Sequence, residues 1–262
     1  PNISIPIKEP RYLIKQSIQN VSDDDPIKPY LLRSSILDKE SYNKLYNNKS
    51  EKILCDASSQ YLYHHREVIT QIKALKDSQP TKIIILLRNP IERAFSNYLH
   101  NCATFEDLDF FQALEQEHNR ILKGFNSFWH YKGLSTYYDS VKAYLEAFDE
   151  VKIILFEDFV NNIDLTLVDI FNFLQVDSSF KVSHFMINKK STGLPKSKTL
   201  NSILQSSSNF KLTKAILHKT IGQKRTKLIK EFIMRKNLSK SKISLQEPLK
   251  SNLESYFVED IE

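Results

Sequence analysis

Short apolar runs alternate with helix-like patterns along the first two thirds of the chain. Three runs are rich in Ile, Leu and Val, as strands are when a parallel sheet buries both of their faces. They cover residues 52–55, 83–87 and 151–156. Apolar residues three or four positions apart predict amphipathic helices over residues 60–75, 90–102, 133–148 and 165–174. This alternation predicts an α/β fold with a parallel sheet, whose ligands bind beyond the carboxyl ends of the strands.

The length and composition of the chain fit one globular domain. It has 262 residues, 41% apolar and 26% charged, without an internal repeat or a linker rich in Pro, Gly or Ser. No apolar run approaches the ~20 residues of a membrane-spanning helix, and no signal peptide is visible. The two cysteines cannot build a disulfide framework. A cytoplasmic protein is therefore expected, with the Golgi lumen as the alternative.

Positive charge is concentrated towards the C-terminus. The net charge is +6, and residues 211–242 carry eleven Lys or Arg and a single acid, Glu231. Such a segment can attract an acidic partner, but a solvated helical face is the more common explanation. No nucleic-acid-binding motif accompanies the segment, so no nucleic-acid partner is expected.

Glycine is too rare to form the common phosphate-binding loops. The four glycines stand at positions 124, 133, 193 and 222, so neither GxxxxGK[ST] nor GxGxxG is present. An unrelated P-loop kinase is disfavoured on this ground, and no Asp-rich magnesium site is apparent. The seven histidines show no HxxxH or HExxH spacing, so no metal is expected.

The run at 83–87 leads directly into the most informative motif. Arg88 follows the predicted strand, Asn89 suits the N-cap of the next helix, and Pro90 suits its first position. Ser96 lies two turns into this helix. A guanidinium and a hydroxyl beside one pocket suit a phosphate. A salt-bridged arginine and an ordinary surface serine would fit the residues equally well.

The segment RNPIERAFSNYLH, which begins at Arg88, closely resembles the 3′-phosphate-binding motif of PAPS-dependent sulfotransferases. Five further segments resemble the same family in the same order, at residues 1–10, 55–62, 129–148, 154–158 (followed by 170–177) and 188–197. The resemblance covers residues 1–200, and a basic helical part, 201–262, completes a single domain over 1–262. It implies a P-loop-NTPase-like three-layer sandwich around a central parallel sheet.

The resemblance also implies a reaction and a co-substrate. The family transfers a sulfuryl group from PAPS (3′-phosphoadenylyl sulfate) to a hydroxyl or amine, so PAPS and its product PAP are the expected partners. The family's 3′-phosphate contacts correspond to Arg88 and Ser96. A loop around the adenine and the 3′-phosphate corresponds to Lys189, Lys190, Ser191, Thr192 and Gly193. The acceptor is not readable from the sequence; a saccharide and a lipid are both compatible with it.

Glu9 is the expected catalytic residue. In heparan-sulfate-type sulfotransferases, a Glu in the same Lys-Glu context is the proposed general base, and the resemblance assigns this role to Glu9. Most glutamates are simply exposed, which is the alternative for Glu9. His64 and His65 are rival bases, although we expect them to lie on a helix surface.

One family feature is missing from the sequence. The 5′-phosphosulfate loop, Lys-x-Gly-Thr-Thr, follows the family's first strand and should stand before Pro1. We therefore expect a parallel sheet without its first strand and phosphate loop. The chain is then either a fragment of the complete enzyme, inactive alone, or a degenerate PAP/PAPS-binding or interaction protein that does not catalyse.

Overall fold

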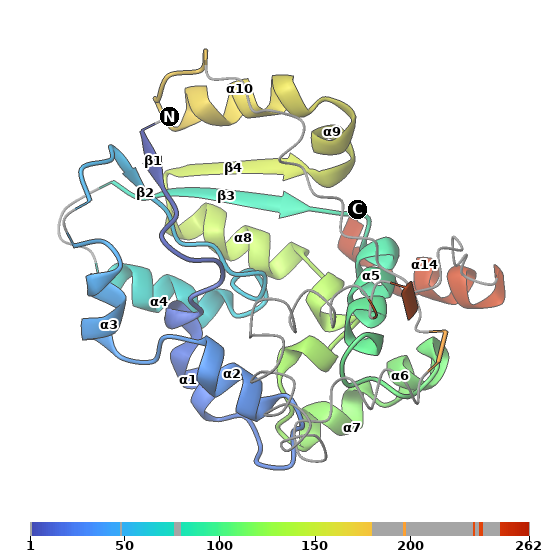
Figure 1. Ribbon diagram of the computed structural model, residues 1–262. Helices are drawn as coiled ribbons and strands as arrows, with labels where there is room; N and C mark the ends of the chain where they lie inside the picture. Colours follow the sequence, from blue (N-terminus) through green and yellow to red (C-terminus); the bar gives the residue numbers. More distant parts are fainter. Residues whose placement is uncertain are drawn as a thin grey trace.

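The structure is a computed structural model that describes residues 2–47, 49–75, 80–179 and 247–261, together with positions 196–197, 233 and 236–237 (Figure 1). The predicted loop from Lys189 to Gly193 and most of the basic segment 211–242 lie outside the described residues. No helix of the described part is long and apolar enough to cross a membrane.

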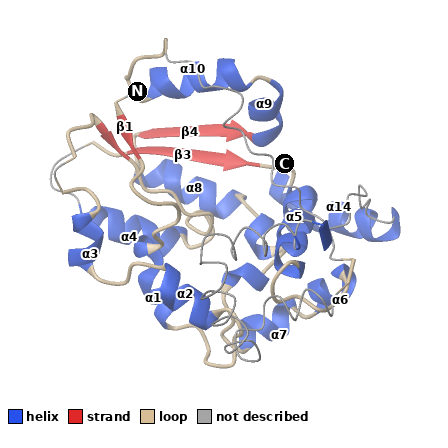
Figure 2. Cartoon of the chain, viewed as in Figure 1, coloured by secondary structure: helices blue, strands red, loops and turns tan. Residues whose placement is uncertain are grey.

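The described strands form two parallel pairs (Figure 2). Strand β1, Ile3–Ser4, pairs with β2, Ile53–Leu54. Strand β3, Lys82–Leu87, pairs with β4, Glu150–Leu155, over six residues each. The predicted runs at 52–55, 83–87 and 151–156 are thus confirmed as parallel strands. Strand β1 was not predicted, because only its pairing with β2 distinguishes two residues from a loop.

Helices lie on both sides of the β3–β4 pair. The helices of the described part of the chain are α1 Lys15–Gln19, α2 Lys28–Ser34, α3 Lys39–Lys44, α4 His65–Leu75, α5 Pro90–Cys102, α6 Phe110–Glu115, α7 Glu117–Leu122, α8 Tyr138–Ala147, α9 Phe156–Asn161, α10 Ile163–Phe173 and α14 Glu247–Ile261. Short 3-10 turns are η1 Tyr12–Ile14, η2 Ser127–Trp129 and η3 Gly133–Ser135. Figure 1 shows α10 on one side of β3–β4 and α8 on the other. This local layering agrees with the predicted three-layer α/β fold, although the described strands do not form one continuous sheet.

Helix α5 begins as its sequence predicts. The Asn89 side chain accepts hydrogen bonds from the backbone N–H groups of Ile91 (3.1 Å) and Glu92 (3.2 Å), with Pro90 at the first helical position. The Glu92 side chain does not complete a capping box; it pairs with Arg88 instead. The N–H group of Asn89 donates to Glu157 at the start of α9 (3.2 Å). The carboxylate of Glu157, which follows β4, therefore adds a hydrogen bond at the N-terminus of α5.

Two apolar clusters hold these layers together. The first packs η1, α1 and α4 against the face of β3 that carries Ile85 and against Tyr144 of α8. The second lies beneath α5, where Ala94, Tyr98 and Phe110 meet Phe257 of α14. Helix α14 thus packs against α5 although about 150 residues separate them in the sequence.

The outer face of β3 and the short strand β2 leave large apolar side chains exposed. Ile84 is 40% exposed, Leu86 is 51% exposed, and Leu54 of β2 is 47% exposed. Strands of a parallel sheet are normally covered on both faces and paired on both edges. Within the described residues, each strand has a single pairing partner.

Candidate functional site

A pocket of about 830 Å³ lies at the carboxyl ends of β3 and β4. Its walls come from the two strand ends, the first residues of α5, one face of α8 and the end of α14. The lining residues are Leu87, Arg88, Asn89, Pro90, Tyr137, Tyr138, Val141, Lys142, Leu145, Leu155, Glu157 and Asp260. This is where a parallel α/β sheet is expected to bind its ligand.

Arg88 contributes a guanidinium that is only partly satisfied. One nitrogen, Nη2, pairs with Glu92 at 2.8 Å, and the group lies over the ring of Phe156 at 4.9 Å from its centroid. Its Nε is buried and has no hydrogen-bond partner among the described residues. A buried donor without an acceptor is costly, so an anion in this pocket would be stabilised by Arg88.

The carboxylates that line the pocket accept hydrogen bonds from backbone N–H groups. Asp260 accepts from Tyr137 and Tyr138 at the start of α8, at 2.7–2.9 Å. The phenol of Tyr137 donates to the carbonyl of Arg88 (3.0 Å), and burial raises the pKa of this phenol to about 12. Tyr137 is therefore a neutral donor at physiological pH, and it holds the backbone of Arg88 in place.

Ser96 lies apart from this pocket. It is half-buried on α5 and does not line the pocket to which Arg88 contributes. It stands seven residues after Asn89, about 10 Å along the helix axis. The expected joint contact of Arg88 and Ser96 with one phosphate stays a prediction. The loop Lys189–Gly193, expected to close the same site, is outside the described residues.

Glu9 occupies a strained turn after β1. Its φ is 54°, in the left-handed region that non-glycine residues rarely adopt, and the proline that follows favours extended backbone at this position. The N–H group of Glu9 donates to the carbonyl of Ala57 (3.2 Å), which ties the turn to the segment after β2. Strain of this kind is often found at functional sites.

The partner of Glu9 is Arg11, which the sequence analysis did not single out. The carboxylate of Glu9 forms an ion pair with the guanidinium of Arg11, whose side chain is only 5% exposed. The other terminal nitrogen of Arg11 donates to the hydroxyl of Ser34 (3.3 Å). Arg11 also has a φ of 54°, so the turn contains two left-handed residues around Pro10. Its only sequence signal is a basic residue two positions after Glu9.

The rival bases are tied into polar contacts between helices. His64 contacts the hydroxyl of Ser17 through Nδ1 (3.2 Å) and that of Ser127 through Nε2 (2.9 Å). Burial lowers the pKa of His64 to about 4. His65 contacts the hydroxyl of Ser140 through Nδ1 (3.1 Å). Both histidines therefore have structural partners, and both are half-buried, whereas we expected them on a helix surface.

No group of three or more His, Cys, Asp or Glu side chains within the described residues is arranged to hold a metal ion. Cys55 is half-buried and Cys102 is buried, and neither forms a disulfide bond.

Two comparisons with known proteins give the same family. The sulfotransferase domain model matches residues 16–250 of the chain. The chain is also similar to the crystal structure of a sulfotransferase from Alicyclobacillus acidocaldarius, with 30% sequence identity and a TM-score of 0.63. That similarity covers 72% of this chain and 77% of the other. No curated protein is significantly similar to the chain.

Proposed function

Because the chain belongs to the sulfotransferase domain family, we propose that it binds PAPS and takes part in sulfuryl transfer from PAPS to a hydroxyl or amine. The observation that supports this most directly is Arg88, which follows β3, lines the 830 Å³ pocket and has a buried Nε without a hydrogen-bond partner among the described residues. The donor set fits an anionic ligand.

In this proposal Arg88 binds the 3′-phosphate. Its present partner, Glu92, is 63% exposed, and exposed ion pairs of this kind contribute only about 0.2–1 kcal/mol. A phosphate dianion can therefore replace Glu92 at little cost. Ser96 would then join the same phosphate from two turns further along α5, and Lys189–Gly193 would cover it.

The rest of the pocket suits the nucleoside. The rings of Tyr137 and Tyr138 and the side chains of Val141 and Leu145 offer aromatic and apolar surface to an adenine. Lys142 adds a positive charge to the same wall. A nucleotide that places its phosphate on Arg88 could lay its base along α8.

Glu9 is the proposed general base. In the transfer step, the acceptor oxygen or nitrogen forms a bond to sulfur while the bond from sulfur to the 5′-phosphate oxygen breaks, and PAP leaves. The carboxylate of Glu9 takes the proton of the acceptor. His64 is the weaker candidate, because both of its ring nitrogens already contact hydroxyls.

The leaving phosphate needs hydrogen-bond donors, which the family supplies with a Lys-x-Gly-Thr-Thr loop. This pattern does not occur in the 262 residues. We propose that a strand carrying this loop pairs between β2 and β3, because each of these strands has a single pairing partner within the described residues. Losing even one preorganised donor at a developing charge costs about 10²–10³ in rate. The chain alone is then a PAP-binding fragment, and a degenerate PAP-binding protein is the second candidate.

Calorimetry and a transfer assay test these two candidates together. We expect the 262-residue chain to bind PAP and not to transfer sulfate from PAPS. If an upstream in-frame segment with the Lys-x-Gly-Thr-Thr pattern restores transfer, the chain is a fragment; PAP binding without transfer in the complete protein supports the degenerate alternative. Absence of PAP binding in both would contradict the proposal.

A further inference from the structure

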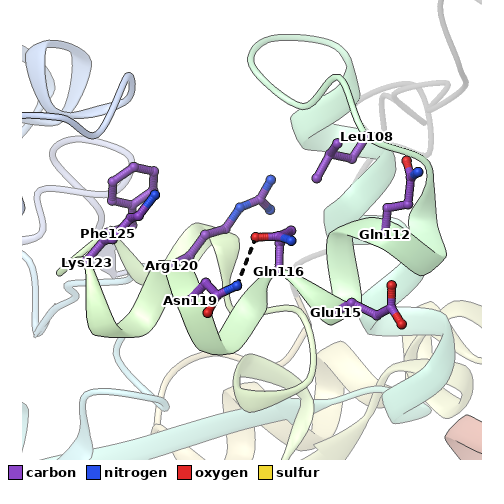
Figure 3. A pocket seen from close by; sticks show the side chains of 8 residues that line it. All are labelled: Leu108, Gln112, Glu115, Gln116, Asn119, Arg120, Lys123 and Phe125. Carbon is purple, nitrogen blue, oxygen red and sulfur yellow. Dashed lines mark hydrogen bonds between the residues drawn. The ribbon is translucent and has the colours of Figure 1, made fainter.

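A second pocket, of about 510 Å³, lies between α6, α7 and the segment before α6 (Figure 3). Its volume falls within the ~300–1,000 Å³ of typical small-molecule sites. The side chains that line it are Leu108, Gln112, Glu115, Gln116, Asn119, Arg120, Lys123 and Phe125. The proposed sulfuryl transfer uses none of these residues.

Arg120 forms a rigid back wall for this pocket. Both terminal nitrogens of its guanidinium bond the carboxylate of Glu106, at 2.7 and 3.0 Å, and Glu106 is buried. The hydroxyl of Tyr131 donates to the same carboxylate (2.7 Å), and the guanidinium lies 4.7 Å from the ring centroid of Trp129. A guanidinium has five N–H donors, so two bonds to Glu106 leave others for a ligand while its charge is balanced.

Three carboxamides lie on the exposed rim of the pocket, and each makes a hydrogen bond to a neighbouring residue. Gln112 belongs to the capping box of α6, where its side-chain oxygen accepts from the N–H group of Asp109 (3.4 Å). Asn119 donates to the side-chain oxygen of Gln116 (3.2 Å), as the dashed line in Figure 3 shows. Within the described part of the chain, the NH₂ groups of Gln112 and Gln116 have no acceptor. The pocket thus offers these donors beside two acceptors, the side-chain oxygen of Asn119 and the carboxylate of Glu115.

The charges of the lining residues and of Glu106, the ion-pair partner of Arg120, cancel. Arg120 and Lys123 contribute two positive charges, and Glu106 and Glu115 contribute two negative charges, which gives a net charge of zero. An anion would gain little from such a balanced set, whereas a hydroxyl both donates and accepts. Half-buried Phe125 and Leu108 add apolar surface for C–H groups.

We propose that the pocket between α6 and α7 binds a neutral sugar unit of a glycan. Its hydroxyls would bond the three carboxamides and the remaining N–H groups of Arg120. Its C–H face would pack on Phe125 and Leu108. The proposal does not depend on sulfuryl transfer, because the site shares no residue with the Arg88 pocket.

Direct binding of chitobiose to the 262-residue chain, measured by ligand-observed NMR without PAPS, tests the proposal. We expect saturable binding that each of Gln116→Ala and Asn119→Ala weakens by about fivefold, the effect of one neutral hydrogen bond. Asn43→Ala, at an exposed asparagine of α3, is the matched control and should leave binding unchanged. Arg120 is kept, because its removal would leave Glu106 buried and unpaired.

Three results would overturn the proposal. Chitobiose could fail to give a saturable signal, or it could bind the Gln116 and Asn119 variants as tightly as the parent protein. Sulfate, tested as sodium sulfate at constant ionic strength, could instead bind in a manner that depends on Gln116 and Asn119 while chitobiose does not bind. The pocket would then be an anion site.

Discussion

The Glu9 turn and the Arg88 turn both follow the carboxyl end of a parallel strand, but they are held in opposite ways. Glu9 and Arg11 adopt left-handed backbone, and the guanidinium of Arg11 is buried against the carboxylate of Glu9. Arg88 leads into a regularly capped helix, and its guanidinium is held by one exposed carboxylate. In the first turn the charged groups of Glu9 and Arg11 pair with each other. In the second turn Arg88 can exchange Glu92 for an anionic ligand.

This difference suits the two turns to different functions. An exchangeable guanidinium suits a phosphate that must bind and leave with every turnover. A carboxylate fixed by a buried partner suits a group whose position relative to a reacting atom must not vary.

The largest expected effect is on catalysis at Glu9. Glu9→Gln in the complete enzyme should lower the rate of sulfate transfer by roughly 10²–10⁴-fold, since the amide cannot accept the acceptor's proton. PAP affinity, measured by calorimetry, should stay the same because Arg88 binds the nucleotide. Glu146→Gln, at an exposed position of α8, serves as the control. Near-full turnover in Glu9→Gln would show that another residue is the general base, and His64 would be the next residue to test.

The next largest effect is on stability at Arg11. Arg11→Ala should lower the free energy of unfolding by about 3 kcal/mol, because it leaves the Glu9 carboxylate, 22% exposed, without its partner. Urea unfolding measures this change. Arg33→Ala, at an exposed arginine of α2, should stay within about 0.5 kcal/mol of the parent. An equally small loss for Arg11→Ala would show that the turn is not held by this pair.

The two turns also differ in how far sequence alone could predict them. Local rules suffice for the Arg88 turn: an apolar strand ends, Asn89 caps, and Pro90 opens α5, so the predicted helix 90–102 is confirmed at both ends. The Glu9 turn depends on contacts with Ala57 and Ser34, which no local pattern encodes. Left-handed backbone at Glu9 also contradicts the preference that the next proline imposes.

The predicted helix 133–148 shows the same limit. Its apolar spacing is real, but the structure divides it into η3 and α8, which begins only at Tyr138. The N–H groups of Tyr137 and Tyr138 donate to Asp260, so a carboxylate more than 120 residues away caps α8. A tertiary partner of this kind leaves no mark in the local sequence.

Removing Arg88 should weaken PAP binding by about 2–3 kcal/mol, the scale of a lost charged hydrogen bond. Calorimetry on Arg88→Ala measures this loss, and Arg66→Ala, at an exposed position of α4, is the matched control. The free energy of unfolding should change little, because the ion pair with Glu92 is exposed. Unchanged PAP affinity would remove Arg88 from the site.

Acid should destabilise the protein through two histidines, His64 and His130, whose charged form is disfavoured in the folded state. Burial lowers the pKa of His64 and of His130 to about 4, below the ordinary value of 6.5. The unfolded chain therefore binds protons first, and stability is lost as the pH falls from 6.5 towards 4. At pH 5 the loss is about 1–2 kcal/mol for each histidine. Urea unfolding at pH 7 and pH 5 should show a smaller difference in His64→Gln; an equal difference would mean that His64 titrates normally.

The smallest effect should come from the partner that Arg88 exchanges. Glu92→Gln removes the charge that competes with a bound phosphate, so PAP affinity should rise by up to about fivefold, the value of an exposed ion pair. Glu146→Gln again controls for the loss of one negative charge, and high salt should reduce the gain because exposed charges are screened. If Glu92→Gln binds PAP more weakly, Glu92 orients Arg88 for the nucleotide. In that case the Arg88 turn is preorganised by its carboxylate as the Glu9 turn is by Arg11, and the contrast between the two turns fails.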